Sequence, residues 1–265
     1  KGGFFVDNKK LKNFNLMMGI FHLIQAIGML VLSLTWDKIK EFTPTINSYF
    51  LEFDPSIGEG GALVTSTQKL FELPFGILVS IFLFISAGAH FIISAFKKTN
   101  EKYNKDLDNN INQFRWYEYA ISSSLMITLI AVLFGVFNIG TLIAIFFLNA
   151  TMNLFGLLME KYNSKRDKVS WLPFIFGSFA GIVPWIIILM YGFGNSDPSL
   201  VPWFVYAIAG TYFVFFNLFP INMVLQYKKI GAWKNYRFGE KIYIILSLTA
   251  KSTLAWLVLF GVMQP

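Results

Sequence analysis

The chain has 265 residues, of which 55% belong to the hydrophobic set and only 14% are charged, with a mean hydropathy of +0.55. A soluble globular domain carries about a quarter charged residues, so a fully solvated surface is excluded and lipid is the expected solvent. The absence of cysteine excludes disulfides and thiolate metal sites. The net charge of +7 is typical of nucleic-acid binding only where the basic residues form a patch, and here they do not.

The apolar residues are grouped into long runs. A membrane-spanning helix needs roughly 20 mostly apolar residues to cross the hydrocarbon core. We therefore predict an all-α bundle of seven spanning helices that forms one domain over residues 1–265, without an appended soluble domain. The first span follows a basic start and is long enough to be a signal anchor, so no cleavable signal peptide is expected. The predicted spans are residues 14–36, 71–96, 112–136, 140–160, 170–193, 201–227 and 239–263.

The only long connection, residues 37–70, follows the first predicted span. It contains Pro44 and a glycine-rich turn at 58–61, and its YFLEF stretch is compatible with a short strand, as in a small β-hairpin. Loops of this length are usually functional or used for contacts. We expect it to cap the outer face of the bundle, with a dimer contact as the alternative.

The basic residues are distributed unevenly among the loops. Cytoplasmic loops carry an excess of lysine and arginine, and this bias sets the orientation of a membrane protein. We therefore expect a multi-pass protein of the cell membrane with its N-terminus in the cytoplasm and its C-terminus outside. Eighteen of the 22 basic residues lie in the N-terminal segment and in every second loop, within the ranges 1–12, 97–115, 161–168 and 228–241.

Four ionisable residues remain well inside the predicted spans: Lys251, Glu118, His22 and His90. A charge at the centre of a membrane helix costs roughly 2.5–3.5 kcal/mol on insertion scales, so such residues usually pair or face a wet cavity. The helical rise, counted from the basic ends of the spans, puts all four in the cytoplasmic half. Polar neighbours share their helix faces at spacings of three or four: Gln25 with His22, Ser86 with His90, Ser122 with Glu118, and Ser247 with Lys251.

Lys251 lies in the middle of the seventh span. An amine in a low-dielectric site gives up its proton more readily and becomes a nucleophile toward a carbonyl, with which it forms a Schiff base. A protonated Schiff base needs a nearby anion, which Glu118 can supply. Small and aromatic residues also pack membrane helices, so a purely structural Lys251–Glu118 ion pair stays open. The fourth span offers one stripe with a glycine that leaves room for a ring: Asn149, Met152, Asn153, Gly156 and Glu160.

Several stretches together resemble a known family. Seven spans with a lysine in SLTAKSTLAW in the last of them resemble the microbial rhodopsins. The RWYEYAISSSLM stretch of the third span, FHLIQ of the first, SAGAH of the second and the inverted orientation are similar specifically to the heliorhodopsins. The resemblance covers essentially all seven spans and the long first loop. It implies a rhodopsin-like fold of inverted topology that binds all-trans retinal.

The resemblance also implies roles for individual residues. Lys251 would carry the retinylidene Schiff base, Glu118 would be its counterion, and Ser122, Ser123 and Ser247 would lie beside that pair. Tyr119 and Trp256 would border both the cofactor and a hydrated cavity. No metal ligand is implied. The residues expected to line the proton-accepting cavity are His22, Gln25, Ser86 and His90, and those expected to contact the chromophore are Asn149, Met152, Gly156 and Phe216.

The function implied by the resemblance is that of a light sensor rather than an enzyme. Photoisomerisation and deprotonation of the Schiff base would drive a slow signalling photocycle without net ion pumping, in a homodimer that acts on a cytoplasmic signalling partner. The alternative is a light-gated proton channel or weak proton transporter on the same chromophore, because the buried carboxylate and histidines could shuttle protons. A membrane enzyme or metal transporter that uses His22, His90 and Glu118 is disfavoured, because these residues lack the close spacing typical of metal ligands.

Overall fold

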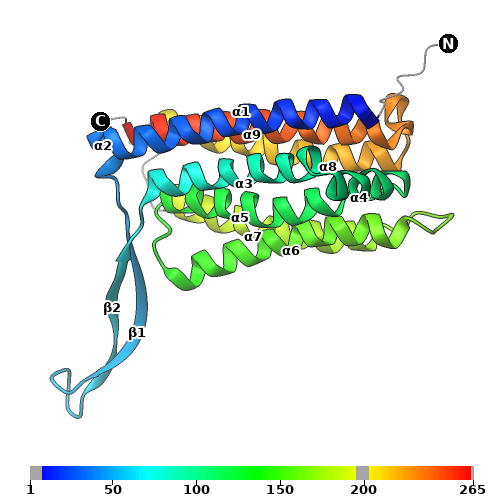
Figure 1. The fold of residues 1–265 in the computed structure, drawn as a ribbon. Helices are drawn as coiled ribbons and strands as arrows, with labels where there is room; N and C mark the ends of the chain where they lie inside the picture. The colour runs from blue at the N-terminus through cyan, green and yellow to red at the C-terminus, as the bar shows by residue number, and fades with distance from the viewer. Residues whose placement is uncertain (1–7, 195–202, 264–265) are drawn as a thin grey trace.

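A computed structural model describes residues 8–194 and 203–263, which form a bundle of long helices with a β-hairpin at one end (Figure 1). The prediction of seven spanning helices is confirmed by length and apolar character, with boundaries that differ by a few residues. The predicted start of the sixth span at residue 201 lies outside the described residues. The seven helices are α1 (Asn8–Thr35), α3 (Phe75–Ala95), α5 (Gln113–Leu133), α6 (Ile139–Asn163), α7 (Leu172–Phe193), α8 (Trp203–Tyr227) and α9 (Tyr236–Met263).

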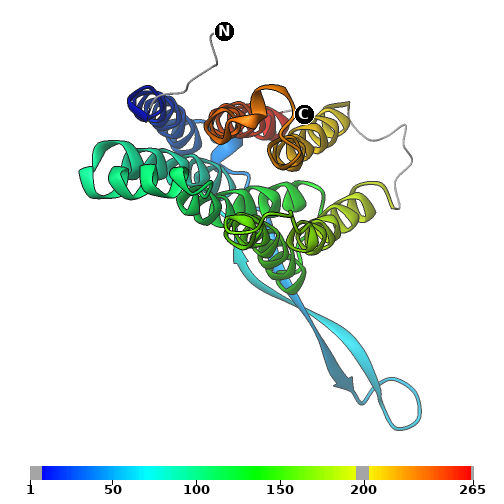
Figure 2. The ribbon, with the colours of Figure 1, turned by 90° about the vertical axis from the view of Figure 1, so that its right-hand side faces the viewer.

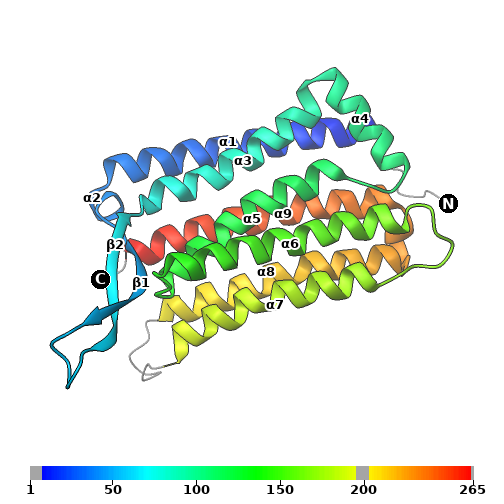
Figure 3. The same cartoon turned by 90° about the horizontal axis from the view of Figure 1, so that it is seen from below.

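Most spanning helices that follow one another in the chain pack side by side. The pairs are α1 with α3, α3 with α5, α5 with α6, α6 with α7, and α8 with α9 (Figure 3). Viewed along the bundle, α9 lies between α1 and α8 (Figure 2). The largest cluster of buried apolar side chains fills the hairpin end and includes Met29, Phe75, Ile130 and Leu254. Buried charged side chains lie beyond Lys251 toward the opposite end, so the two ends of the bundle differ sharply in polarity.

The long first loop is a β-hairpin. Its strands β1 (Thr45–Asp54) and β2 (Ala62–Glu72) pair antiparallel along their whole length, so the hairpin is longer than the predicted short strand and includes residues 71–72 of the predicted second span. It extends away from the bundle (Figure 1), so the expected cap over the outer face is wrong. The two strands form backbone hydrogen bonds with each other and so make up an arm. The arm contacts the bundle where Asn47 N donates a hydrogen bond to Phe137 O at 2.9 Å.

Three short helical segments complete the described chain. They are α2 (Asp37–Lys40), α4 (Lys97–Asp108) and a 3₁₀ turn at Gly231–Lys234. Helix α4 was expected as a basic loop, but its apolar side chains Tyr103 and Leu107 are buried against the bundle while its lysines stay at the surface. The amphipathic pattern of α4 consists of only two apolar residues four positions apart within a highly charged segment, so the sequence alone does not indicate a helix there.

Gly156 of α6 allows the close approach of α5. The ring of Trp116 occupies the space beside it that was predicted to leave room for a ring of a ligand: a Cβ added at Gly156 would overlap Trp116. We expect Gly156→Ala to destabilise the protein by about 1–3 kcal/mol through overpacking. The matched control is Gly210→Ala in α8, where a Cβ meets open space and alanine gains about 1 kcal/mol of helix propensity. Thermal unfolding in detergent checks both variants, and equal midpoints would contradict the steric explanation.

Candidate functional site

Lys251 lies deep in the bundle with 2% of its surface exposed. Its three ammonium hydrogens have three acceptors: Glu118 Oε1 at 2.5 Å, Ser86 Oγ at 2.7 Å and Ser122 Oγ at 2.8 Å. The ring of Tyr119 lies 5.0 Å from the ammonium nitrogen, close enough for a cation–π contact. Ser86 in turn donates to Glu118 at 2.7 Å. The structure thus brings the predicted lysine and carboxylate together as a buried, fully hydrogen-bonded ion pair.

Three helices position this pair. Each presents two polar residues one turn apart, because residues at i and i+4 lie one above the other on a helix. The lysine reaches back toward the start of α9, the direction in which side chains lean along a helix. The three pairs are Ser86 and His90 on α3, Glu118 and Ser122 on α5, and Ser247 and Lys251 on α9.

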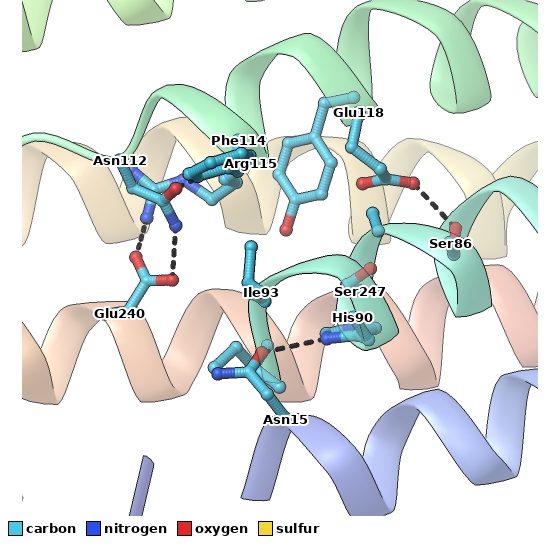
Figure 4. A pocket seen from close by; sticks show the side chains of 13 residues that line it. Asn15, Ser86, His90, Ile93, Asn112, Phe114, Arg115, Glu118, Glu240 and Ser247 are labelled. Atoms are coloured by element: carbon cyan, nitrogen blue, oxygen red, sulfur yellow. Dashed lines mark hydrogen bonds and ion pairs between the residues drawn. The ribbon is translucent and has the colours of Figure 1, made fainter. Parts of the chain in front are cut away.

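A small cavity of about 30 Å³ adjoins the ion pair on the polar side of the bundle (Figure 4). Its volume is enough for one or two water molecules, and its lining offers the polar partners that a buried water needs. Glu118 and Ser86 lie at one end and Glu240 at the other (Figure 4). The polar lining residues are Asn15, Ser86, His90, Asn112, Arg115, Glu118, Tyr119, Glu240 and Ser247.

The two histidines are stacked, with ring centroids 5.5 Å apart. His90 lines the small cavity and its Nδ1 lies 2.9 Å from Asn15 Oδ1. The Asn15 amide nitrogen already donates to its own helix, so the amide oxygen is the acceptor and His90 Nδ1 is the donor. His22 lies behind His90, and neither ring nitrogen has a partner in the described part of the chain. Gln25 donates to the main chain of its own helix and does not reach the cavity lining.

A large cavity of about 570 Å³ lies on the other side of Lys251, among α5, α6, α7, α8 and α9. Its volume is within the range of small-molecule pockets, and its walls are mostly aromatic and aliphatic, as such pockets require. Among the described residues that line this cavity, Lys251 is the only one with a charged side chain. The predicted residues that line it are Tyr119, Ser123, Met152, Gly156, Phe216 and Lys251, joined by Trp116, Phe174, Trp185, Phe213 and Phe219.

Two predicted pocket residues lie outside the lining. Asn149 stands behind Ser123, to which its amide donates at 2.9 Å, and so supports the wall from the second layer. Trp256 lines neither cavity. Its ring stacks on Phe260 at 5.8 Å and packs against the apolar cluster at the hairpin end. It lies five residues beyond Lys251, toward that end, which carries it away from the polar side.

Sequence reasoning missed a second buried charge cluster, formed by Arg115, Glu160 and Glu240 and called here the Arg115 cluster. Arg115 Nη1 pairs with Glu240 and Nη2 with Glu160. Exposure is 1% for Glu240, 2% for Glu160 and 6% for Arg115. Arg115 belongs to the basic range 97–115 and Glu160 to the stripe on the fourth span, and neither range nor stripe predicts a buried ion pair. The available signal was the spacing on the last span, where Glu240, Ser247 and Lys251 share one face.

The Arg115 cluster is expected to contribute strongly to stability. Removing one partner of a buried ion pair leaves an uncompensated charge and costs about 3–5 kcal/mol, so we expect Arg115→Gln to lower the free energy of unfolding by that amount. Arg237→Gln is the matched control, because Arg237 pairs with Asp108 near the surface and such pairs contribute about 0.2–1 kcal/mol. Denaturant unfolding in micelles checks both; a loss no larger for Arg115 than for Arg237 would contradict the role of the cluster.

Comparison with protein families gives a match to the family described as heliorhodopsin over residues 11–263. The matched region contains the hairpin, the residues that line both cavities, and the seven spanning helices except for the first three residues of α1. Among curated proteins, no match was found.

Proposed function

The chain belongs to the heliorhodopsin family of retinal-binding membrane proteins, and we propose that it is a light sensor in which all-trans retinal is linked to Lys251 as a protonated Schiff base. Bound in this way, retinal supplies absorption of visible light and photoisomerisation. The observation that carries the proposal is the position of Lys251, whose amine is paired with Glu118 and whose side chain lines the large apolar cavity.

The large cavity suits a long apolar chromophore. Met152, Gly156 and Phe216 would contact it, and Ser123, held by Asn149, would offer it a hydroxyl. Aromatic side chains supply flat, apolar walls without an unbalanced charge. Trp116 and Phe219 belong to this wall and join the expected contacts as further candidates.

Around the Lys251 nitrogen, the residues of the chain would hold and guide a proton. Glu118 would act as the counterion, and Ser86 and Ser122 would hold the nitrogen by hydrogen bonds. A proton that leaves this nitrogen would move toward the small cavity, where Ser86, His90 and Ser247 provide polar groups. His22 would support this region from behind His90, on which its ring stacks, whereas Gln25 would stay outside the cavity lining.

The difference between the two ends of the bundle supports sensing without net ion transport. A pump needs proton-relay groups on both sides of its switch, whereas the described buried residues at the hairpin end include no charged side chain and no histidine. We propose that a cytoplasmic signalling partner binds at the polar end of the bundle and that the protein forms a homodimer. A dimer contact on the hairpin is supported by its exposed apolar side chains Tyr49, Phe50, Leu51 and Phe53.

The light-sensor proposal is tested by reconstitution. Purified protein incubated with all-trans retinal should develop a visible absorption band that hydroxylamine removes under light, because hydroxylamine cleaves the Schiff base. Illumination of cells that contain the protein should leave the external pH unchanged. Transported protons would instead change the external pH, and a protonophore would abolish that change. Colourless protein would contradict retinal binding, and a protonophore-sensitive pH change would contradict sensing without transport.

The inverted orientation is proposed from the distribution of basic residues. The chain has no cysteine, so single cysteines can report topology without background. In intact cells, a membrane-impermeant thiol reagent should label Glu59→Cys in the hairpin turn and leave Lys165→Cys, in the connection between α6 and α7, unlabelled until the cells are lysed. Labelling of Lys165→Cys alone in intact cells would place the N-terminus outside.

A further inference from the structure

One face of α9 connects the two buried charge clusters. Glu240, Ile244, Ser247 and Lys251 follow one another at spacings of four, three and four, so they lie on one stripe of the helix. All but Lys251 line the small cavity, and Lys251 binds Glu118, which lines it too. The cavity therefore has a carboxylate at each end, Glu118 beside Ser86 and Glu240 beside Asn112 (Figure 4).

The two ends differ in charge balance. Lys251 and Glu118 form a balanced pair, whereas Arg115 alone faces both Glu160 and Glu240. With both carboxylates ionised, the Arg115 cluster carries one net negative charge in a region that is almost completely buried. An unbalanced buried charge is costly, and the gain of one proton would neutralise the cluster.

The hydrogen bonds indicate which carboxylate takes this proton. Glu160 accepts from Arg115 and from three further donors, namely Asn112 N at 2.8 Å, Trp116 Nε1 at 2.7 Å and Tyr236 OH at 2.9 Å. Four donors favour the ionised form. Glu160 also does not line the small cavity.

Glu240 accepts fewer hydrogen bonds than Glu160, and unlike Glu160 it lines the small cavity. Besides Arg115, it accepts from Asn112 Nδ2 at 2.6 Å and from Tyr103 OH at 3.2 Å. Burial raises the pKa of the Tyr103 hydroxyl well above its usual value, so Tyr103 remains a neutral donor. Arg115 Nε is buried, belongs to a residue of the cavity lining, and has no partner within the described ranges. An unpaired donor beside an acceptor with a free lone pair suits a water molecule that contacts Glu240.

We infer that Glu240 is the residue that stores the proton released at the Lys251 nitrogen, an inference that rests on the proposed function. The N–H bond breaks and its electron pair stays on nitrogen. The proton passes through water in the small cavity to a carboxylate oxygen of Glu240, which becomes a neutral acid, and the reverse transfer resets the site. The titratable and charged groups around Glu240 are His90 on α3, Tyr103 on α4, Arg115, Glu118 and Tyr119 on α5, Glu160 on α6, and Tyr236 and Tyr243 on α9.

His90 is the competing acceptor. Its Nδ1 hydrogen is donated to Asn15, so a new proton would have to go to Nε2 and would create a buried cation. Protonation of Glu240 instead removes a charge. The two outcomes differ in their infrared signature, because only a carboxyl group gains the carbonyl stretch of a carboxylic acid on protonation.

Infrared difference spectroscopy tests the inference in two steps. First, acid titration of the retinal-free protein should produce a buried carboxylic-acid band that Glu240→Gln removes, that the surface variant Glu101→Gln retains, and that Glu240→Asp restores at a shifted frequency. Second, illumination of the pigment should produce the same band, kinetically matched to loss of the protonated visible absorption, again lost in Glu240→Gln and kept in Glu101→Gln.

Two results would overturn the inference: a light-induced acid band that persists in Glu240→Gln, and normal deprotonation of the pigment with no acid band at all. Protein that takes up no retinal would overturn the light-driven step together with the proposed function. It is recognised by its missing visible band, while the acid titration still reports whether Glu240 is the carboxyl that gains the proton.

Discussion

Lys251→Ala is expected to leave the protein colourless when it is incubated with all-trans retinal. Within residues 8–194 and 203–263, the substitution removes the one amine that lines the large cavity, and without an amine no Schiff base can form. Absorption spectroscopy of the purified protein, followed by acid denaturation to detect covalently attached retinal, measures the loss directly.

The controls separate loss of the amine from loss of the fold. Lys241→Ala changes an exposed lysine ten residues earlier on the same helix and should leave the absorption band intact. Lys251→Ala also leaves Glu118 buried without its cation, which should lower the free energy of unfolding by about 3–5 kcal/mol. The double variant with Glu118→Gln removes both charges, so it should recover much of that stability and still remain colourless. Covalent retinal in Lys251→Ala would exclude this lysine as the attachment site.

Glu118→Gln is expected to keep the pigment but to change its spectrum and titration. The carboxylate oxygen lies 2.5 Å from the Lys251 nitrogen, and an adjacent anion stabilises the protonated form of that nitrogen. Replacing it with a neutral amide of the same shape should move the midpoint of the colour titration to lower pH by about 1–3 units. The absorption maximum should also move, because the charge beside the chromophore is lost.

A surface variant serves as the reference. Glu101→Gln removes an exposed carboxylate in α4 whose partner, Lys97, lies 4.0 Å away at the surface, and it should leave both the spectrum and the titration unchanged. A Glu118→Gln pigment that titrates like the unaltered protein would mean that another group balances the cation.

The number of spans, their approximate ends and the residues that share each helix face follow from composition and periodicity. A run of about 20 apolar residues has few alternatives to a spanning helix, because lipid offers no partner for backbone groups. Because lipid also offers no partner for a charged side chain, a lysine and a glutamate within such runs are expected to form an ion pair. The structure places Lys251 against Glu118. Ser86 and Ser122 were indicated by their spacing alone.

The contacts between helix faces were decided only by tertiary packing. Periodicity shows that Glu240, Ser247 and Lys251 share a stripe, but it does not show that Arg115 and Glu160 from two other helices close around Glu240. Likewise, a glycine at 156 indicates space for a ring, whereas the approach of α5 puts Trp116 in that space. The family resemblance predicts that Trp256 borders the polar site, but its position along α9 places it against the apolar cluster at the hairpin end. Helical spacing is a local property, while the partner of each face depends on how whole helices cross, and that is encoded in the packing of many side chains at once.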